Sequence, residues 1–224
     1  MDIEGHYKWI VFLPCKENNI GALNRYYGLF DTGEIKVRGI ELRQHSTPIY
    51  LKNLQKDILN LFSKAENKKE FLDLIFFSLE IIKKYAKKII NFEIDFGDLL
   101  IRSRVSRNLS EYKVNTLVKS ALMQYIDQEI NVEPGQSIRY LVTNQKSKNS
   151  KKRVCIDYLI KEKTKIDVDF YLKEIAKCSE SILLPFGYTK EKIEDILFKI
   201  KKREDCNVSI LPRAWTHKTS YRLL

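Results

Sequence analysis

The sequence of 224 residues predicts an α+β fold, with short antiparallel strands followed by a mainly helical region that contains a few further strands. Two apolar stretches near the N-terminus, separated from each other by turn residues, predict the first strands. Apolar residues spaced by three and four positions predict the helices that follow. We therefore expect residues 1–45 to form a strand region and residues 46–224 a mostly helical one. This length suits one domain or two small ones.

The first strands are predicted to be incomplete as a sheet. The stretch 7–14 (YKWIVFLP) is apolar on both faces, as is typical of a strand buried on both sides. Residues 15–23 are polar and predict a loop. The stretch 24–42 predicts a hairpin, because Gly33 can adopt a positive φ in its turn. Three such strands cannot cover both faces and both edges, so the rest of the chain or another chain must do so.

The helices are predicted from their caps as well as from their apolar spacing. Thr47 is expected to be the N-cap of a helix that begins with Pro48 and ends near Ser63. Asn67 and Glu70 have the spacing of a capping box, at the start of a helix that runs to about residue 91. Further helices are expected at 115–128, at 167–186 after an Asp cap and at 189–202 after a Thr cap, and further strands at 98–106, 138–143 and 154–160.

The charge of the chain indicates a polyanionic partner. Lysine and arginine number 40 against 29 aspartates and glutamates, a net charge of +11. Nucleic acid is a more natural partner than a membrane for such a chain, although a lysine-rich composition can also serve solubility alone. Residues 146–153 (KSKNSKKR) predict either a solvated loop or a loop over DNA, and composition does not decide between them.

Cysteine usage and hydropathy argue against several other classes of protein. The four cysteines are far apart and form no C-x-x-C pair, so we expect reduced thiols and neither a zinc site nor a disulfide framework. The longest apolar runs are too short to cross a bilayer, and the N-terminal residues have no signal-peptide layout. An intracellular, cytoplasmic location is expected, with association to the nucleoid if DNA is the partner.

No catalytic constellation is evident from the residues themselves. The three histidines are scattered, and the eight glycines form no phosphate-binding loop. Asp167 and Asp169 are closely spaced, but they stand at a predicted helix start, where capping accounts for them. We therefore predict no catalytic residue and no metal ligand in this chain, which indicates a binding module or a non-catalytic subunit.

The hairpin carries the first candidate binding residues. Arg25 and Tyr27 are two positions apart, so they point to the same face of one strand. A cation beside an aromatic hydroxyl can hold a phosphate or a base edge. An ordinary exposed arginine beside a half-buried tyrosine fits the same spacing.

From this hairpin onward, the sequence resembles family B DNA polymerases. Arg25-Tyr26-Tyr27 stands at the K-x-Y motif of that family, with Arg in place of Lys, and Arg38-Gly39-Ile40-Glu41 is similar to its R-G-[IL]-E motif. Further motifs follow in the family's order: VSRNL at 105–109 with YK at 112–113, EPG at 133–135 with IRY at 138–140, DVDFYL at 167–172, LPFGY at 184–188 and AW at 214–215. The resemblance covers nearly all of the chain.

Several parts of that family have no counterpart in this sequence. They are the two motifs with the metal-binding aspartates, the nucleotide-binding lysine helix and the proofreading exonuclease. The resemblance therefore implies that residues 1–45 are the last palm strands, which complete a partner's sheet, and that residues 46–224 are the thumb. Some archaea encode this polymerase as two genes, and the chain resembles the small subunit of such a split enzyme. Its large subunit would carry the exonuclease and the catalytic palm, and would hold the Mg ions.

The resemblance also implies a function for individual residues. The complex would transfer a nucleotidyl group to a primer 3′-hydroxyl with two metal ions held by the partner. Arg25 and Tyr27 would contact primer–template DNA from the minor groove, and cations of the thumb would hold its phosphates. Where many archaeal relatives have Pro-His, this chain has Leu117-Val118, and Lys119 is a weak substitute. The implied DNA contacts are Arg25, Tyr27, Arg38, Arg107, Tyr112, Lys113 and Lys119.

Two other functions remain open from the sequence. The first is a catalytically inactive, polymerase-derived protein that binds DNA without a partner. The second is a structural adaptor whose positive charge serves only solubility.

Overall fold

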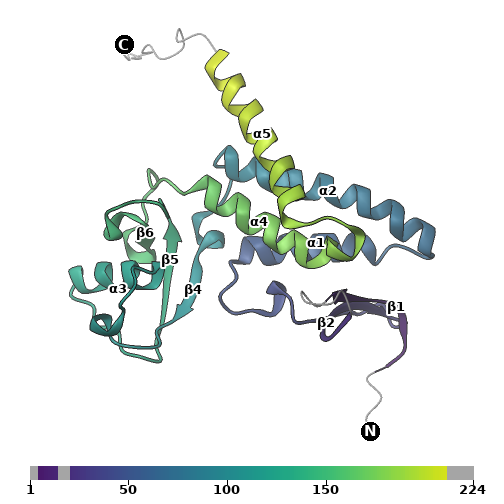
Figure 1. Cartoon of the computed structure of the whole chain (residues 1–224), viewed down its shortest axis with the longest axis horizontal. Helices are drawn as coiled ribbons and strands as arrows, with labels where there is room; N and C mark the ends of the chain where they lie inside the picture. The colour runs from purple at the N-terminus through teal and green to yellow at the C-terminus, as the bar shows by residue number, and fades with distance from the viewer. Residues whose placement is uncertain (1–4, 15–20, 211–224) are drawn as a thin grey trace, which may run out of the picture.

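The computed structural model describes residues 5–14 and 21–210, apart from the side chains at 21, 23 and 205–210. It confirms the α+β class. Figure 1 shows a bundle of long helices with one three-stranded sheet below it and a lobe, built on a second three-stranded sheet, at its left end. The predictions for Cys15, Ala214 and Trp215 fall outside the described residues.

Sheet A is the N-terminal sheet, and its strands are antiparallel in chain order. They are β1 (Tyr7–Pro14), β2 (Gly21–Phe30) and β3 (Ile35–Arg38). The predicted hairpin is confirmed: Gly33 has a φ of +86°, and the amide of Phe30 donates to the carbonyl of Glu34 at 2.9 Å. The loop predicted at 15–23 is shorter than expected, because β2 begins at Gly21, which pairs with Pro14.

One face of sheet A packs against the helices, and the other faces outward. The Trp9 ring meets the Phe71 ring edge-on at 5.0 Å, and Tyr27 stacks near Phe62. The expectation that β1 is buried on both faces is wrong, because Ile10 and Phe12 are 36% and 45% exposed on the opposite side. Nothing in the described part of this chain covers that side of β1.

Two long helices follow, joined by a short turn. They are α1 (Ile49–Phe62) and α2 (Lys68–Ile90). The predicted Thr47 cap is wrong: Pro48 occupies the N-cap position, and no side chain caps the helix. The Asn67 cap is confirmed, because its side chain accepts from the Glu70 amide at 3.0 Å. The Glu70 carboxylate accepts from the amide of Glu66 at 2.9 Å, so this first turn is held from both sides.

The second lobe contains sheet B and a covering helix. Its elements are η2 (Phe96–Leu99), β4 (Ile101–Arg104), η3 (Leu109–Glu111), α3 (Leu117–Asp127), β5 (Ser137–Val142), η4 (Ser150–Lys152), β6 (Val154–Ile156) and η5 (Asp157–Leu159). The sheet is antiparallel in the order β4-β5-β6. The predicted strand at 98–106 is shorter than expected, because its first residues form the 3-10 turn η2. The strand predicted at 154–160 likewise ends early, in η5.

The lysine-rich segment at 146–153 lies against this lobe. The Arg153 side chain donates to the carbonyls of Ser147 and Asn115 at 2.8 and 2.9 Å. Lys151 forms an ion pair with Asp127, at the end of α3, at 2.6 Å. The side chains of Lys151 and Arg153 are therefore held by the lobe, whereas Lys146, Lys148 and Lys152 are exposed.

The last helices complete the bundle. They are α4 (Val168–Leu183), the short η6 (Leu184–Phe186) and α5 (Lys190–Ile210). The predicted Asp167 cap is confirmed by a 3.0 Å bond from the Phe170 amide, and Gly187 ends the segment with a φ of +82°. Helix α5 begins after Thr189, as predicted, but continues past Lys202. Burial raises the pKa of the free thiol of Cys178 in α4 well above its ordinary value.

A buried carboxylate joins the hairpin to the helices. Glu41 lies in η1 (Glu41–Arg43) and is only 8% exposed. It accepts hydrogen bonds of 3.0 Å from Gln55 in α1 and from Ser181 in α4. Gln55 also donates to the Cys178 carbonyl at 2.8 Å. The final residue of the R-G-I-E motif therefore has a structural role in this chain.

This network predicts the effect of removing the carboxylate. Replacing Glu41 by Ala leaves the Gln55 amide and the Ser181 hydroxyl without their acceptor, which costs about 1–3 kcal/mol of unfolding free energy. Urea unfolding followed by circular dichroism measures the change. The exposed Glu162→Ala variant is the matched control, and equal stability of the two variants would contradict the assignment.

Candidate nucleic-acid interface

A glycine positions Arg25 at one end of sheet A. Gly39 has a φ of +70°, and a Cβ there would meet the Asn24 carbonyl oxygen and, at 2.7 Å, the Arg25 Cγ. The absent side chain thus lets the chain leaving β3 pass directly against Arg25, whose Nε donates to the Gly39 carbonyl at 3.3 Å. This contact positions Arg25 next to the end of β3.

Arg38 belongs to the outward face of sheet A. It pairs in register with Tyr26, which in turn pairs with Phe12 on β1. The Phe12 and Tyr26 rings are 5.7 Å apart. Arg38 is exposed at the end of this aromatic row, and Lys36 lies two positions earlier on the same face. The outward face therefore combines aromatic rings with cations.

Tyr27 must be removed from the predicted DNA contacts. Its side chain is fully buried, at 0% exposure, on the inner face of sheet A. Its hydroxyl donates to the Ile182 carbonyl of α4 at 2.9 Å, and burial raises its pKa far above the ordinary value. The two-residue spacing assigns Arg25 and Tyr27 to the same face of β2. It does not show that helices cover this face at Tyr27. Tyr27 is a packing residue that holds β2 against α4.

A second group of candidate residues converges between β4 and α3. The Arg107 guanidinium carbon lies 5.5 Å from the centre of the Tyr112 ring. The Lys119 ammonium donates to the Tyr112 carbonyl at 2.8 Å, which leaves two of its protons for another acceptor. Lys113 is exposed beside Tyr112. The structure thus brings together Arg107, Tyr112, Lys113 and Lys119, whereas Arg25 and Arg38 belong to sheet A.

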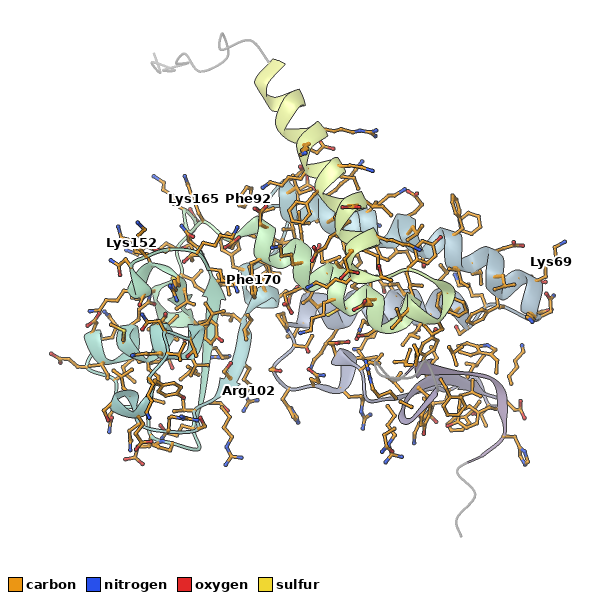
Figure 2. All side chains as sticks on the ribbon, viewed as in Figure 1. Lys69, Phe92, Arg102, Lys152, Lys165 and Phe170 are labelled. Carbon is orange, nitrogen blue, oxygen red and sulfur yellow. The ribbon has the colours of Figure 1, made fainter. Side chains whose placement is uncertain are left out.

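Sheet B adds cations that were absent from the predicted contacts. Arg102 and Arg104 are exposed on β4, where they alternate with the half-buried Ile101 and Ser103. Arg102 pairs in register with Arg139, whose guanidinium forms a 2.9 Å ion pair with Asp157. Figure 2 shows Arg102 at the lower edge of β4, on the side of the molecule on which sheet A also lies. Strand alternation combined with charge would have found both arginines.

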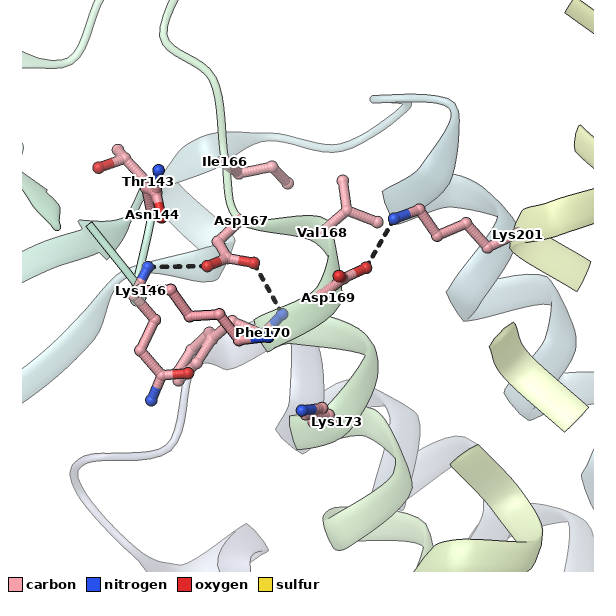
Figure 3. A pocket seen from close by; sticks show the side chains of 11 residues that line it. Thr143, Asn144, Lys146, Ile166, Asp167, Val168, Asp169, Phe170, Lys173 and Lys201 are labelled. Atoms are coloured by element: carbon pink, nitrogen blue, oxygen red, sulfur yellow. Dashed lines mark hydrogen bonds and ion pairs between the residues drawn. The ribbon is translucent and has the colours of Figure 1, made fainter. Parts of the chain in front are cut away.

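The described carboxylates do not make a magnesium site. Asp167 accepts from the Gln145 amide at 2.8 Å as well as capping α4, and Asp169 is paired with Lys201 at 2.6 Å (Figure 3). Among the described residues, no group of three histidine, cysteine, aspartate or glutamate side chains could hold a metal ion. The two aspartates of this pair therefore have structural roles.

No helix in the described part of the chain is both long and apolar enough to cross a bilayer.

Comparison with known proteins identifies the family. Residues 2–185 match the family model of DNA polymerase family B, so the chain belongs to that family. It is 27% identical over 195 residues to a DNA polymerase of Pyrococcus horikoshii, covering 86% of this chain and 14% of that protein. It is 25% identical to DNA polymerase 1 of Saccharolobus solfataricus, covering 86% of this chain and 20% of that one. The chain thus spans about a fifth or less of these curated relatives.

A solved structure shows the same fold. The family B DNA polymerase of Pyrobaculum calidifontis superposes with a TM-score of 0.63 at 20% identity, covering 81% of this chain and 22% of that one. The α+β arrangement described above is therefore an arrangement that occurs within a polymerase of this family.

The buried position of Tyr27 predicts that removing its hydroxyl lowers the stability of the fold without changing DNA binding. Tyr27→Phe removes the bond to the Ile182 carbonyl and lowers the free energy of unfolding by about 1 kcal/mol. It leaves the affinity for DNA unchanged at temperatures where the variant is folded. Tyr158→Phe, at a tyrosine that is 68% exposed, is the control. Weaker DNA binding by folded Tyr27→Phe would restore Tyr27 to the interface.

Proposed function

We propose that this chain is the small subunit of a two-chain family B DNA polymerase. It supplies the thumb and the primer–template-gripping part of the palm, and a large subunit supplies the exonuclease and the catalytic palm. Membership of the family supports template-directed DNA synthesis as the activity of the complex. The observation that carries the two-chain proposal is the outward face of sheet A.

That outward face has the character of a surface made to be covered. Ile10 and Phe12 are exposed on it, and the strand order leaves β1 and β3 as the two edges of the sheet. Exposed apolar residues on an edge strand favour pairing with another chain. Within the described residues, therefore, the sheet is covered on one face only. A palm strand or helix of the partner would cover it.

An apolar groove beside β1 supports the same partner. It is lined by Trp9 and Ile10 from β1 and by Phe71 and Leu72 from α2. The indole Nε1 of Trp9 is buried and has no hydrogen-bond partner among the described residues. An apolar segment of the partner that lies in this groove would remove its lining from water.

In the proposed mechanism, this chain holds the nucleic acid while its partner performs the transfer. The metal ions, held by the partner's aspartates, supply the charge stabilisation of nucleotidyl transfer. Arg25 and Arg38 approach the duplex near the primer end, where the minor-groove acceptors are nearly independent of sequence. Arg107, Lys113 and Lys119 hold backbone phosphates from the thumb, and Tyr112 orients Arg107. Such contacts position DNA without reading it.

The proposal predicts a complex that depends on the outward face. Mixed with a family member that carries the two catalytic aspartate motifs, the chain forms a stoichiometric heterodimer in size-exclusion chromatography. Phe12→Glu weakens that association by at least about tenfold, because it buries a charge in the contact. Val114→Glu, at a side chain that is 71% exposed on the other lobe, is the control. A chain that is monomeric, cooperatively folded and soluble alone, and that binds no such partner, would contradict the proposal.

Arg25 is predicted to contribute to extension more than to folding. In the reconstituted complex, Arg25→Ala slows primer extension about tenfold, the loss expected for one charged hydrogen bond to DNA. Its melting temperature stays within a degree or two of the parent, as expected for a surface substitution. Lys69→Ala, at the far end of α2 in Figure 2, is the control. An unchanged rate at matched stability removes Arg25 from the interface.

A polymerase-derived protein that binds DNA but takes no part in synthesis is the competing function. It would bind primer–template in a salt-dependent manner yet support no extension with any partner. Binding and extension measured on the same preparations therefore distinguish the two.

A further inference from the structure

Helix α2 ends in a conformation that its sequence does not favour. Asn91 is the C-cap, and Phe92 follows with a φ of +58°. The Glu93 amide donates to the Lys88 carbonyl at 2.8 Å and the Phe92 amide to the Ile89 carbonyl at 3.2 Å, the two bonds of a Schellman motif. Glycine is the usual residue at this left-handed position, and a bulky side chain there is strained.

The strained residue presents an aromatic ring to solvent. The Phe92 side chain is 51% exposed, and Figure 2 shows it at the end of α2. A phenylalanine that served only packing would be expected to face the core. The ring is therefore accessible to a ligand.

Cations line a groove beside the two residues that flank Phe92. Asn91 and Glu93, the two neighbours of Phe92, line the same groove as Lys84, Lys87 and Lys88. An adjoining groove between α2 and α5 shares Lys83 and Lys87 and adds Lys199 and Arg203. Lys83 is paired with Glu80 at 2.7 Å. In the described part of the chain, the other five cations have no carboxylate partner.

Helix electrostatics explains only part of this cluster. Lys87 and Lys88 stabilise the C-terminal end of α2, where cations favour the helix dipole. That effect does not account for Lys199 and Arg203, which come from α5 and line the groove shared with Lys87. Lys84 and Lys88 are one turn apart, about 6 Å along the helix axis, so they form a row on one face. Together the cations form a track that leads to Phe92.

We propose that this track and the Phe92 ring bind single-stranded nucleic acid. Grooves that bind single strands combine cations along the backbone with aromatic side chains on which bases stack. Here the lysines of α2 and the cations of α5 hold phosphates, and Phe92 stacks on one base. The α2–α5 crossing lies on the opposite side of the bundle from sheet A (Figure 1), so this surface is distinct from the primer–template residues. It does not depend on the two-chain arrangement.

The structure offers a matched pair of variants to test this surface. Glu129 ends α3 in the same way, with a φ of +58° and a 3.0 Å bond from the Ile130 amide to the Tyr125 carbonyl. Phe92→Gly and Glu129→Gly each relieve the left-handed strain, so both keep or raise the melting temperature. Only Phe92→Gly removes the ring. Affinity of the full chain for a labelled oligothymidylate is measured by fluorescence anisotropy.

Phe92→Gly is expected to bind the oligothymidylate about tenfold more weakly, as for the loss of one stacked base, while Glu129→Gly binds like the parent. Phe92→Leu, which keeps the apolar bulk without the π-face, is expected to lose affinity similarly, and Phe92→Tyr to retain it. Wild-type affinity in Phe92→Gly and Phe92→Leu would overturn the proposal. So would an equal loss in Glu129→Gly.

The charge of the track is tested separately. The double variant Lys84→Glu/Lys88→Glu is expected to bind oligothymidylate with a shallower slope of log affinity against log salt concentration. The change in slope should correspond to the loss of about one to two phosphate contacts. An unchanged salt dependence would overturn the assignment of these lysines. The proposed polymerase function is tested separately, by primer–template extension with a partner subunit and by its loss in Arg25→Ala. Failure of one proposal therefore does not affect the test of the other.

Discussion

The arrangement of this chain depends on buried polar contacts made by helix α4. The Tyr27 hydroxyl donates to the Ile182 carbonyl, and the Ser181 hydroxyl donates to the Glu41 carboxylate. Eleven residues before Ile182, on the same helix, the Tyr171 hydroxyl accepts from the Val142 amide of β5 at 3.0 Å. A single helix is therefore hydrogen-bonded to both sheets. Because unpaired buried groups are costly, these bonds fix positions as well as adding stability.

This common anchor fixes the spacing between the two sets of cations that we propose to contact one duplex. Arg25 and Arg38 are fixed by sheet A, while Arg102 and Arg107 lie on or just beyond β4 of sheet B. Each belongs to a sheet that α4 holds, so the distance between the sets is set by a helix and not by flexible loops. A rigid spacing of this kind suits the repeating phosphates of a duplex, for which positioning matters more than base readout.

The sequence predicted the fold class and most elements, because helix caps and apolar periodicity are local signals. Asn67 and Asp167 cap helices as expected, and Gly33 makes the turn of the hairpin. One local prediction was wrong, because Pro48 and not Thr47 occupies the N-cap of α1. Two other predictions were wrong because they depended on tertiary context. Tyr27 was predicted to contact DNA because its spacing from Arg25 assigns it to a face of the strand. Spacing does not show whether helices cover that face. The outward side of β1 was predicted to be buried for the same reason. Its apolar residues indicate that it should be covered, but they do not show which segment or chain covers it.

The R-G-I-E motif shows how one short stretch can combine structure and function. Ile40 is 1% exposed and Glu41 is hydrogen-bonded in the core, so both are accounted for by packing. Gly39 is required because a Cβ would collide with the Asn24 carbonyl. Arg38 is the residue of the motif that has an exposed side chain. A motif match therefore does not make every one of its residues a ligand contact. Packing and chain geometry account for Gly39, Ile40 and Glu41, and Arg38 is the residue that we propose to contact DNA.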